Sequence, residues 1–351
     1  MDIWDWVFDA QRELRASGQE RLADIVDQVP PLAADGQHEQ VEAMVPEGIA
    51  LARTIEHPWI ELFLRHWLAQ SRIICRGDVT TGMNEVVRLL DFAHEDFTRD
   101  CPQSVCVTQD FCVAHSVLDA LGYAEERLAA CEESLGRISP AWPCFGCIST
   151  EYFNALFDLG RYSEAEAFSA RHIAAMKPSS HARNYLMVQR AQALSALDRH
   201  EESLQVILSV KVSGHGRKLK AFHAISLARE YAHARRFDEA KQALPNPRKI
   251  DPGDYRDWIG AKRSICAGQP ESNDAELERT LRGFLDTLQA NGALYWRASV
   301  AASAARFALE RGDSTAFASH IGSLRGALPL LRKPERLADE LATMIASTTV
   351  D

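Results

Sequence analysis

A turn that recurs at nearly constant spacing is the feature that most limits what this chain can fold into. Three copies can be aligned, at LFDLGRYSEAEAF (156–168), LSALDRHEESLQV (194–206) and YAHARRFDEAKQAL (231–244). Their central residues, Gly160, Asp198 and Arg235, are 38 and 37 residues apart. An internal period of this length indicates an array of repeated supersecondary units.

Further copies of the turn extend the repeat toward both ends of the chain. Gly312 lies 77 residues beyond Arg235, which is close to two periods. Earlier and looser copies centre on Gly77 and Gly36, and Leu121-Gly122 is another candidate, in a register that the sequence leaves open. The repeat therefore covers most of the 351 residues.

Each repeat has the pattern of two helices joined by the turn. Before the turn, apolar residues recur at steps of three and four, as in Ala224, Leu227, Ala228 and Tyr231, which predicts a helix with a small-residue face. After the turn, an aromatic or His residue is followed three residues later by a small one, and a second helix begins. The pattern predicts an all-α chain of antiparallel helix pairs.

One copy of this pattern is specific enough to compare with a known family. It carries Ala224, Leu227, Ala228, Tyr231, Phe237 and Ala240. These positions resemble the tetratricopeptide repeat family, although Ala224 stands where the family usually has Trp and the unit is longer than the family's roughly 34 residues. The resemblance covers residues 30–330 and implies a superhelix of stacked helix pairs with a concave groove.

The expected organisation is a single superhelical domain over residues 1–351. Residues 1–30 are predicted to be N-terminal capping helices, 31–330 about eight helix pairs that are clearest at 145–245, and 331–351 a C-terminal capping helix. Pro30-Pro31 is expected to end a helix between units, because proline removes a backbone donor. The pairs are expected to pile into an elongated arc.

Charge is unevenly distributed along the chain. The net charge is −16 for residues 1–175 and +6 for residues 176–351, and residues 211–249 carry ten basic residues against three acidic ones. The basic stretch suits an acidic segment of a partner, or is only a solvated basic face. Nucleic acid is disfavoured because the acidic half would repel phosphate and no recognition motif is present.

Six of the eight cysteines fall between residues 101 and 147. Cys112, His115, Cys144 and Cys147 are the candidates for a zinc site, since Cys-x-x-Cys lets two thiolates reach one ion. A second pair with metal spacing is missing, so core packing as free thiols is favoured, and a redox pair at Cys144 and Cys147 is a further alternative. We expect no metal and no disulfide framework.

The motifs of enzymes are missing from the sequence. It has no Gly-x-Ser-x-Gly elbow, no His-Glu-x-x-His and no complete phosphate loop, so no catalytic residue and no cofactor is expected. No apolar run approaches the roughly 18 residues of a membrane span. The start of the chain lacks the order of a signal peptide. A cytoplasmic protein is expected.

The resemblance implies that the first helix of each pair lines the groove. Carried onto this sequence, it gives the partner-binding candidates Asn154, Tyr185, Gln192, Phe222, Arg229, His233 and Arg306. The predicted function is a non-enzymatic scaffold that binds a protein or peptide. The alternatives are a peptide-responsive sensor without its own DNA-binding domain and a zinc protein built on the cysteine cluster.

Overall fold

The computed structural model describes residues 3–176, 181–269 and 274–348. Within these ranges the chain forms eighteen α-helices and five short 3-10 or π segments, and it forms no strand. The all-α prediction is confirmed. The main hydrophobic core runs through the helices from Ile3 to Met344, and a small separate cluster is formed by Ala232, Ala240 and Ile265. No helix in the described ranges is both long and apolar enough to cross a membrane.

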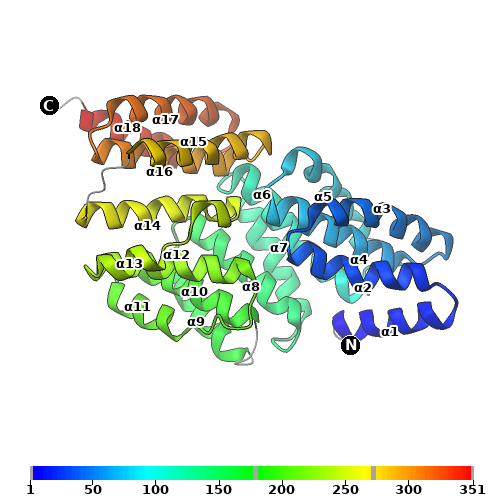
Figure 1. Cartoon of the computed structure of the whole chain (residues 1–351). Helices are drawn as coiled ribbons and strands as arrows, with labels where there is room; N and C mark the ends of the chain where they lie inside the picture. Colours follow the sequence, from blue (N-terminus) through cyan, green and yellow to red (C-terminus); the bar gives the residue numbers. More distant parts are fainter. Residues whose placement is uncertain (1–2, 177–180, 270–273, 349–351) are drawn as a thin grey trace.

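Two terminal helices enclose eight pairs, and each pair has a first and a second helix (Figure 1). Helices α1 (Ile3–Ala16) and α18 (Glu335–Thr348) stand at the two ends. The first helices of the intervening pairs are α2 (Glu20–Ala34), α4 (Pro58–Ala69) extended by the π segment η1 (Gln70–Cys75), α6 (Val107–Asp119), α8 (Pro143–Asp158), α10 (His181–Ala196), α12 (Arg217–His233), α14 (Tyr255–Gly268) and α16 (Leu294–Glu310).

The second helices of the pairs are α3 (His38–Thr54), α5 (Val79–His94), α7 (Ala124–Arg137), α9 (Tyr162–Ala175), α11 (His200–Ser209), α13 (Phe237–Ala243), α15 (Asp274–Ala290) and α17 (Ser314–Ala327). The 3-10 segments are η2 (Pro102–Val105), η3 (Pro247–Lys249), η4 (Pro252–Asp254) and η5 (Leu328–Leu330). Most second helices pack on the first helix of their own pair. The exception is α15, which packs on α16 of the next pair.

The recurring turn has one backbone geometry. The six aligned positions have positive φ angles, at Gly36 (74°), Gly77 (66°), Gly160 (74°), Asp198 (58°), Arg235 (57°) and Gly312 (71°). A left-handed residue of this kind ends a helix and reverses the chain. The turn period predicted from the sequence is therefore present in the structure, and each of these turns joins the two helices of a pair.

The helix stop expected at Pro30-Pro31 is wrong. Both prolines lie inside α2, which continues to Ala34. Pro30 and its neighbour Val29 are buried, and α2 packs on α3 and α4. We attribute the continuation of the helix to this packing, which opposes the cost of the lost backbone hydrogen bonds. The N-terminal cap is therefore α1, and α2 belongs to the first pair.

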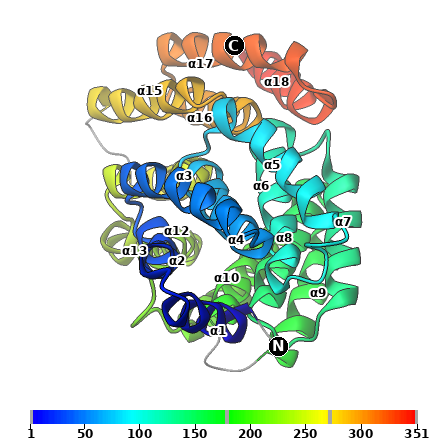
Figure 2. The same cartoon turned by 90° about the vertical axis from the view of Figure 1, so that its right-hand side faces the viewer.

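The array curls round until its two halves meet, where an elongated arc was expected. Helix α16 packs against α6, and in Figures 1 and 2 helices α15–α18 form a layer beside α5 and α6. The amide of Val79 donates to the Asn291 carbonyl (3.1 Å), and Asn291 Nδ2 donates to the Arg76 carbonyl (2.6 Å). In Figure 2 the ribbons of α4, α6, α8, α10 and α12 lie in a ring.

Candidate functional site: an interior cavity

A cavity of about 600 Å³ lies inside the curled array. Its described lining residues come from the first helices of all eight pairs, together with α1, η2, η4 and the residues that precede α6 and α12. None of them comes from a second helix. Each pair thus places its first helix at the cavity and its second helix on the outside. The lining is therefore formed by every second helix along the sequence.

Side-chain carboxamides are the commonest polar groups of the lining. They are Gln70, Gln103, Gln109, Asn154, Gln189 and Gln192. Gln189 Nε2 donates to Asn154 Oδ1 (2.7 Å) and to the Thr150 carbonyl (3.2 Å), which links α10 to α8. Each carboxamide combines a donor and an acceptor, the same pair that a peptide group carries.

Several buried polar atoms at the cavity have no hydrogen-bond partner among the described residues. Both amide atoms of Gln103 lack a partner although this side chain is fully buried. The same lack of a partner is found for three further buried atoms, Gln189 Oε1, Trp67 Nε1 and Asp254 Oδ2. Buried polar groups in proteins nearly always have partners, so this concentration of unpaired atoms points to a ligand or to water in the cavity.

Two buried carboxyl groups give the cavity its electrostatic character. Burial raises the pKa of Glu151 to about 7, against the opposing influence of Arg127 and Lys218. Burial likewise raises the pKa of Asp254 to about 7. Lys218 at the start of α12 donates to the Ile74 carbonyl (3.4 Å) and acts on both carboxyl groups.

The other charged residues of the lining are neutralised by neighbours. Asp158 Oδ2 accepts from Arg127 Nη1 (2.8 Å), whose side chain is buried between α7 and α8. Asp257 pairs with Arg256 (3.8 Å), another residue of the lining, and its Oδ2 also accepts from Gln192 Nε2 (2.8 Å), which ties α14 to α10. A smaller cavity of about 200 Å³ shares Asp158 and Asp257 with this lining and is lined in part by α18.

Four of the seven groove residues predicted from the sequence line the cavity. They are Asn154, Tyr185, Gln192 and Phe222. The rings of Tyr185 and Phe222 stack with their centroids 5.0 Å apart, so these two residues on α10 and α12 form a continuous aromatic surface. The sequence pattern thus brings together side chains from three consecutive pairs.

The other three predicted residues lie away from the cavity. Arg229 and His233 occupy the last turns of α12, where Arg229 Nε contacts Glu230 Oε1 (3.2 Å) and the His233 ring stacks on His200 (3.9 Å). Arg306, in the second half of α16, pairs with Glu340 (2.6 Å). Only the first halves of α12 and α16 reach the lining, because later turns pack on neighbouring helices.

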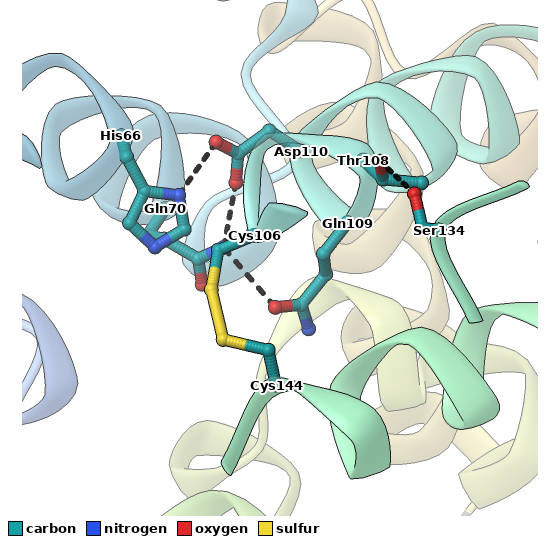
Figure 3. The surroundings of a disulfide bond; sticks show 8 residues. All are labelled: His66, Gln70, Cys106, Thr108, Gln109, Asp110, Ser134 and Cys144. Carbon is teal, nitrogen blue, oxygen red and sulfur yellow. Dashed lines mark hydrogen bonds and ion pairs between the residues drawn. A yellow bond between two sulfur atoms is a disulfide. The ribbon is translucent and has the colours of Figure 1, made fainter. Parts of the chain in front are cut away.

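The cysteine cluster contains a disulfide that the sequence analysis did not predict. Cys106, just before α6, is bonded to Cys144 in the first turn of α8, with their Cα atoms 6.0 Å apart (Figure 3). Both half-cystines line the cavity. The candidate pair Cys144 and Cys147 is therefore not a redox pair in this structure. The short link between α6 and α8 fixes one wall of the cavity.

The remaining candidates for a zinc site are used in packing. Cys112 Sγ lies 3.5 Å from Cys131 Sγ, and His115 Nδ1 lies 2.8 Å from the Phe111 carbonyl. Across the described ranges, no group of three or more His, Cys, Asp or Glu side chains is arranged to hold a metal ion.

The free thiols of Cys75 and Cys147 and the imidazole of His66 also line the cavity. Burial raises the pKa of Cys147 to about 11, and it raises the pKa of Cys75, so both thiols are protonated at neutral pH. His66 Nδ1 is hydrogen-bonded to Asp110 Oδ2 (2.8 Å), and Gln70 Nε2 donates to Asp110 Oδ1 (2.6 Å) (Figure 3). This buried network joins α4 and η1 to α6.

Sequence reasoning missed several residues of the lining, although part of the signal was present. Glu151 lies one helical turn before Asn154, and Gln189 lies one turn from both Tyr185 and Gln192. Extending each predicted groove residue by three or four positions would have found them. Gln103 and Asp254 lie on the 3-10 segments η2 and η4, outside any helical period.

Comparison with known proteins adds no identification. No model of a known protein family matches the chain, and a search of curated proteins found no similar sequence.

Proposed function

We propose that this protein is a non-enzymatic binding protein that holds a short peptide segment in its interior cavity. In this proposal the helix pairs form a superhelix of the tetratricopeptide kind, whose first helices supply the binding wall. The alternation of lining and outer helices supports that reading. Side chains projected from stacked repeats would form one extended surface, as repeat proteins use for recognition.

The unpartnered carboxamide atoms carry the proposal. A peptide placed among Gln103, Gln189 and Asn154 would offer backbone N–H and C=O groups to side chains that match them in type. It would also satisfy the buried atoms that lack partners in the described structure. The volume of about 600 Å³ falls within the roughly 300–1,000 Å³ typical of ligand sites.

The basic stretch at residues 211–249 remains a prediction about a separate surface. Of its ten basic residues, only Arg217 and Lys218 line the cavity. Arg229 and Arg236 contact acidic side chains of their own helices or turns. An acidic partner segment, if it binds there, would meet the exposed turn after α12 and would compete with these internal ion pairs.

Peptide selection with the full chain tests the proposal. A library of random heptapeptides displayed on phage is selected against the purified protein, and the enriched sequences are synthesised with a fluorescent label. We expect micromolar dissociation constants by fluorescence anisotropy. Failure to enrich any sequence over successive rounds would count against a peptide site.

Two variants of the lining and one control variant then locate the site. Ser116→Phe adds a ring to the lining on α6, and we expect it to abolish binding, whereas Ser319→Phe on the exposed face of α17 leaves binding unchanged. Gln103→Met removes two unpaired amide atoms, so it should weaken binding at least tenfold without lowering stability. Unaltered binding by both Ser116→Phe and Gln103→Met would contradict the cavity as the site.

A further inference from the structure

Two carboxyl groups of the cavity wall have no cation of their own. Glu151 is 4% exposed and Asp254 is 6% exposed, and both line the cavity. The hydrogen bond found for Glu151 comes from Asn154 Nδ2 at 3.5 Å, and Asp254 Oδ2 has none. No Lys, Arg or His nitrogen of the described residues lies within 4 Å of either carboxyl group. Buried carboxylates are ordinarily paired.

One ammonium group serves both carboxyl groups at longer range. Lys218 acts electrostatically on Glu151 and on Asp254, and its described hydrogen bond goes to the Ile74 carbonyl. The nearby charges are already matched, because Arg217 pairs with Asp251 (2.9 Å). Asp158 pairs with Arg127 (2.8 Å), and Asp257 pairs with Arg256 (3.8 Å). Two negative groups therefore share one positive group, and the cavity lacks one positive charge.

Aromatic faces border the same region. The Trp296 ring packs on the backbone of Gly253, where a Cβ atom would lie 3.2 Å from the ring, and Gly253 directly precedes Asp254. Tyr185 is within electrostatic range of both carboxyl groups and stacks on Phe222. Aromatic faces beside carboxylates attract ammonium and guanidinium groups.

We infer that the peptide held in the cavity presents a positively charged group to Glu151 and Asp254, with Tyr185 and Trp296 as its aromatic surroundings. The group is an alkylammonium or guanidinium, supplied by a Lys or Arg side chain or by a free amino terminus. This inference rests on the proposed peptide site. It concerns the interior, so it is independent of the basic stretch on the outside.

The raised pKa values of Glu151 and Asp254 agree with the shortage of positive charge around them, because a proton can take the place of a cation. Each carboxyl group has a pKa of about 7. The groups that act on them are Arg127 and Cys131 of α7, Cys147 and Asp158 of α8, Tyr185 of α10, Lys218 of α12, and Asp251, Tyr255 and Asp257 around η4. A ligand cation would displace the proton, so binding should strengthen as pH rises from 6 to 8.

Blocked peptides test the charge directly. The probes are N-acetylated, C-amidated pentapeptides Gly-Gln-X-Gln-Gly with X as Lys, Gln or Glu, and the X = Gln peptide with a free amino terminus. Dissociation constants are measured by ligand-observed NMR, which reaches the millimolar range. We expect the Lys peptide to bind at least tenfold more tightly than the Gln peptide at pH 8. A similar gain for the free-amine peptide would identify the amino terminus as a second source of the charge.

Matched variants assign the effect to the two carboxyl groups. The double variant Glu151→Gln, Asp254→Asn should lose the preference for Lys and its pH dependence. The double variant Glu133→Gln, Asp339→Asn removes two exposed carboxylates and should keep both. Each variant preserves shape, and removing buried charge does not threaten folding.

The outcomes separate this inference from the peptide site itself. A Lys preference that disappears only in the buried double variant supports the inference. Tightest binding of the Glu peptide, or a Lys preference that survives in that variant, overturns it. A third outcome is that the Gln peptide binds, that Ser116→Phe abolishes its binding, and that neither Lys at position X nor a free amino terminus increases the affinity. In that case the charge inference fails and the peptide site stands. Failure of every probe to bind overturns both.

Discussion

Glu151 makes the stability of this protein depend on pH in an unusual direction. Its pKa rises from 4.5 to about 7 on folding, so the folded chain binds this proton more tightly than the unfolded chain does. The contribution of Glu151 to stability is therefore fully present below pH 4.5 and is lost as pH rises through 7. We expect Glu151→Gln to raise the free energy of unfolding at pH 8 by on the order of 2 kcal/mol.

Urea unfolding at pH 8 and pH 4.5 checks this prediction. The gain should nearly vanish at pH 4.5, because Glu151 is then protonated in the folded chain and about half protonated in the unfolded chain. Glu133→Gln on the exposed face of α7 is the control and should change little at either pH. An equal gain for Glu151→Gln at both pH values would show that the carboxyl group is not destabilised by burial.

Arg235 occupies a turn position that glycine fills in four of the six aligned repeats. Its φ of 57° lies in the left-handed region, which costs a side chain roughly 1–2 kcal/mol. We expect Arg235→Gly to raise the free energy of unfolding by about 0.5 kcal/mol, after the extra entropy of glycine in the unfolded chain is deducted. Thermal unfolding of the variant and of the natural chain measures this difference in stability. Arg236→Gly, at φ of −94°, should lower stability.

At the scale of the helix, the disulfide is the feature with the largest expected effect. It closes a loop of 38 residues between the start of α6 and the start of α8. Such a link stabilises mainly by restricting the unfolded chain, by roughly 2–4 kcal/mol. We expect Cys106→Ser to lower the free energy of unfolding by about that amount, as measured in urea.

A reductant supplies the control for that prediction. Dithiothreitol should lower the stability of the natural chain to that of Cys106→Ser and should leave the variant unchanged. If the reductant changed neither protein, Cys106 and Cys144 would not be bonded in solution.

Helices and turns followed from the sequence because local pattern decides them. Six of the turn positions between Gly36 and Gly312 take the same backbone conformation, whereas the further candidate Leu121-Gly122 has no positive φ angle. Pro30-Pro31 was misjudged because the packing of α2 on α3 and α4 is not local. The disulfide was missed for the same reason, since the pairing of Cys106 with Cys144 depends on how α6 lies beside α8.

At the scale of the whole molecule, the sequence could not predict that the array closes. Closure depends on small rotations that add up from pair to pair, and its contacts join distant residues such as Arg76 and Asn291. The candidates on α8, α10 and α12 came from the family resemblance, and four of them, Asn154, Tyr185, Gln192 and Phe222, line the cavity. Asp254 and Lys218 gain their significance only when closure buries them in one cavity.

The central claim is that the ligand lies inside the array, against the first helices of the pairs. Photo-crosslinking tests it most directly, with a display-selected peptide that carries a diazirine side chain and with adducts mapped by mass spectrometry. We predict adducts on α8, α10 and α12, at or next to lining residues such as Tyr185 and Phe222. Adducts confined to the outer helices α9, α11 and α13 would contradict the account.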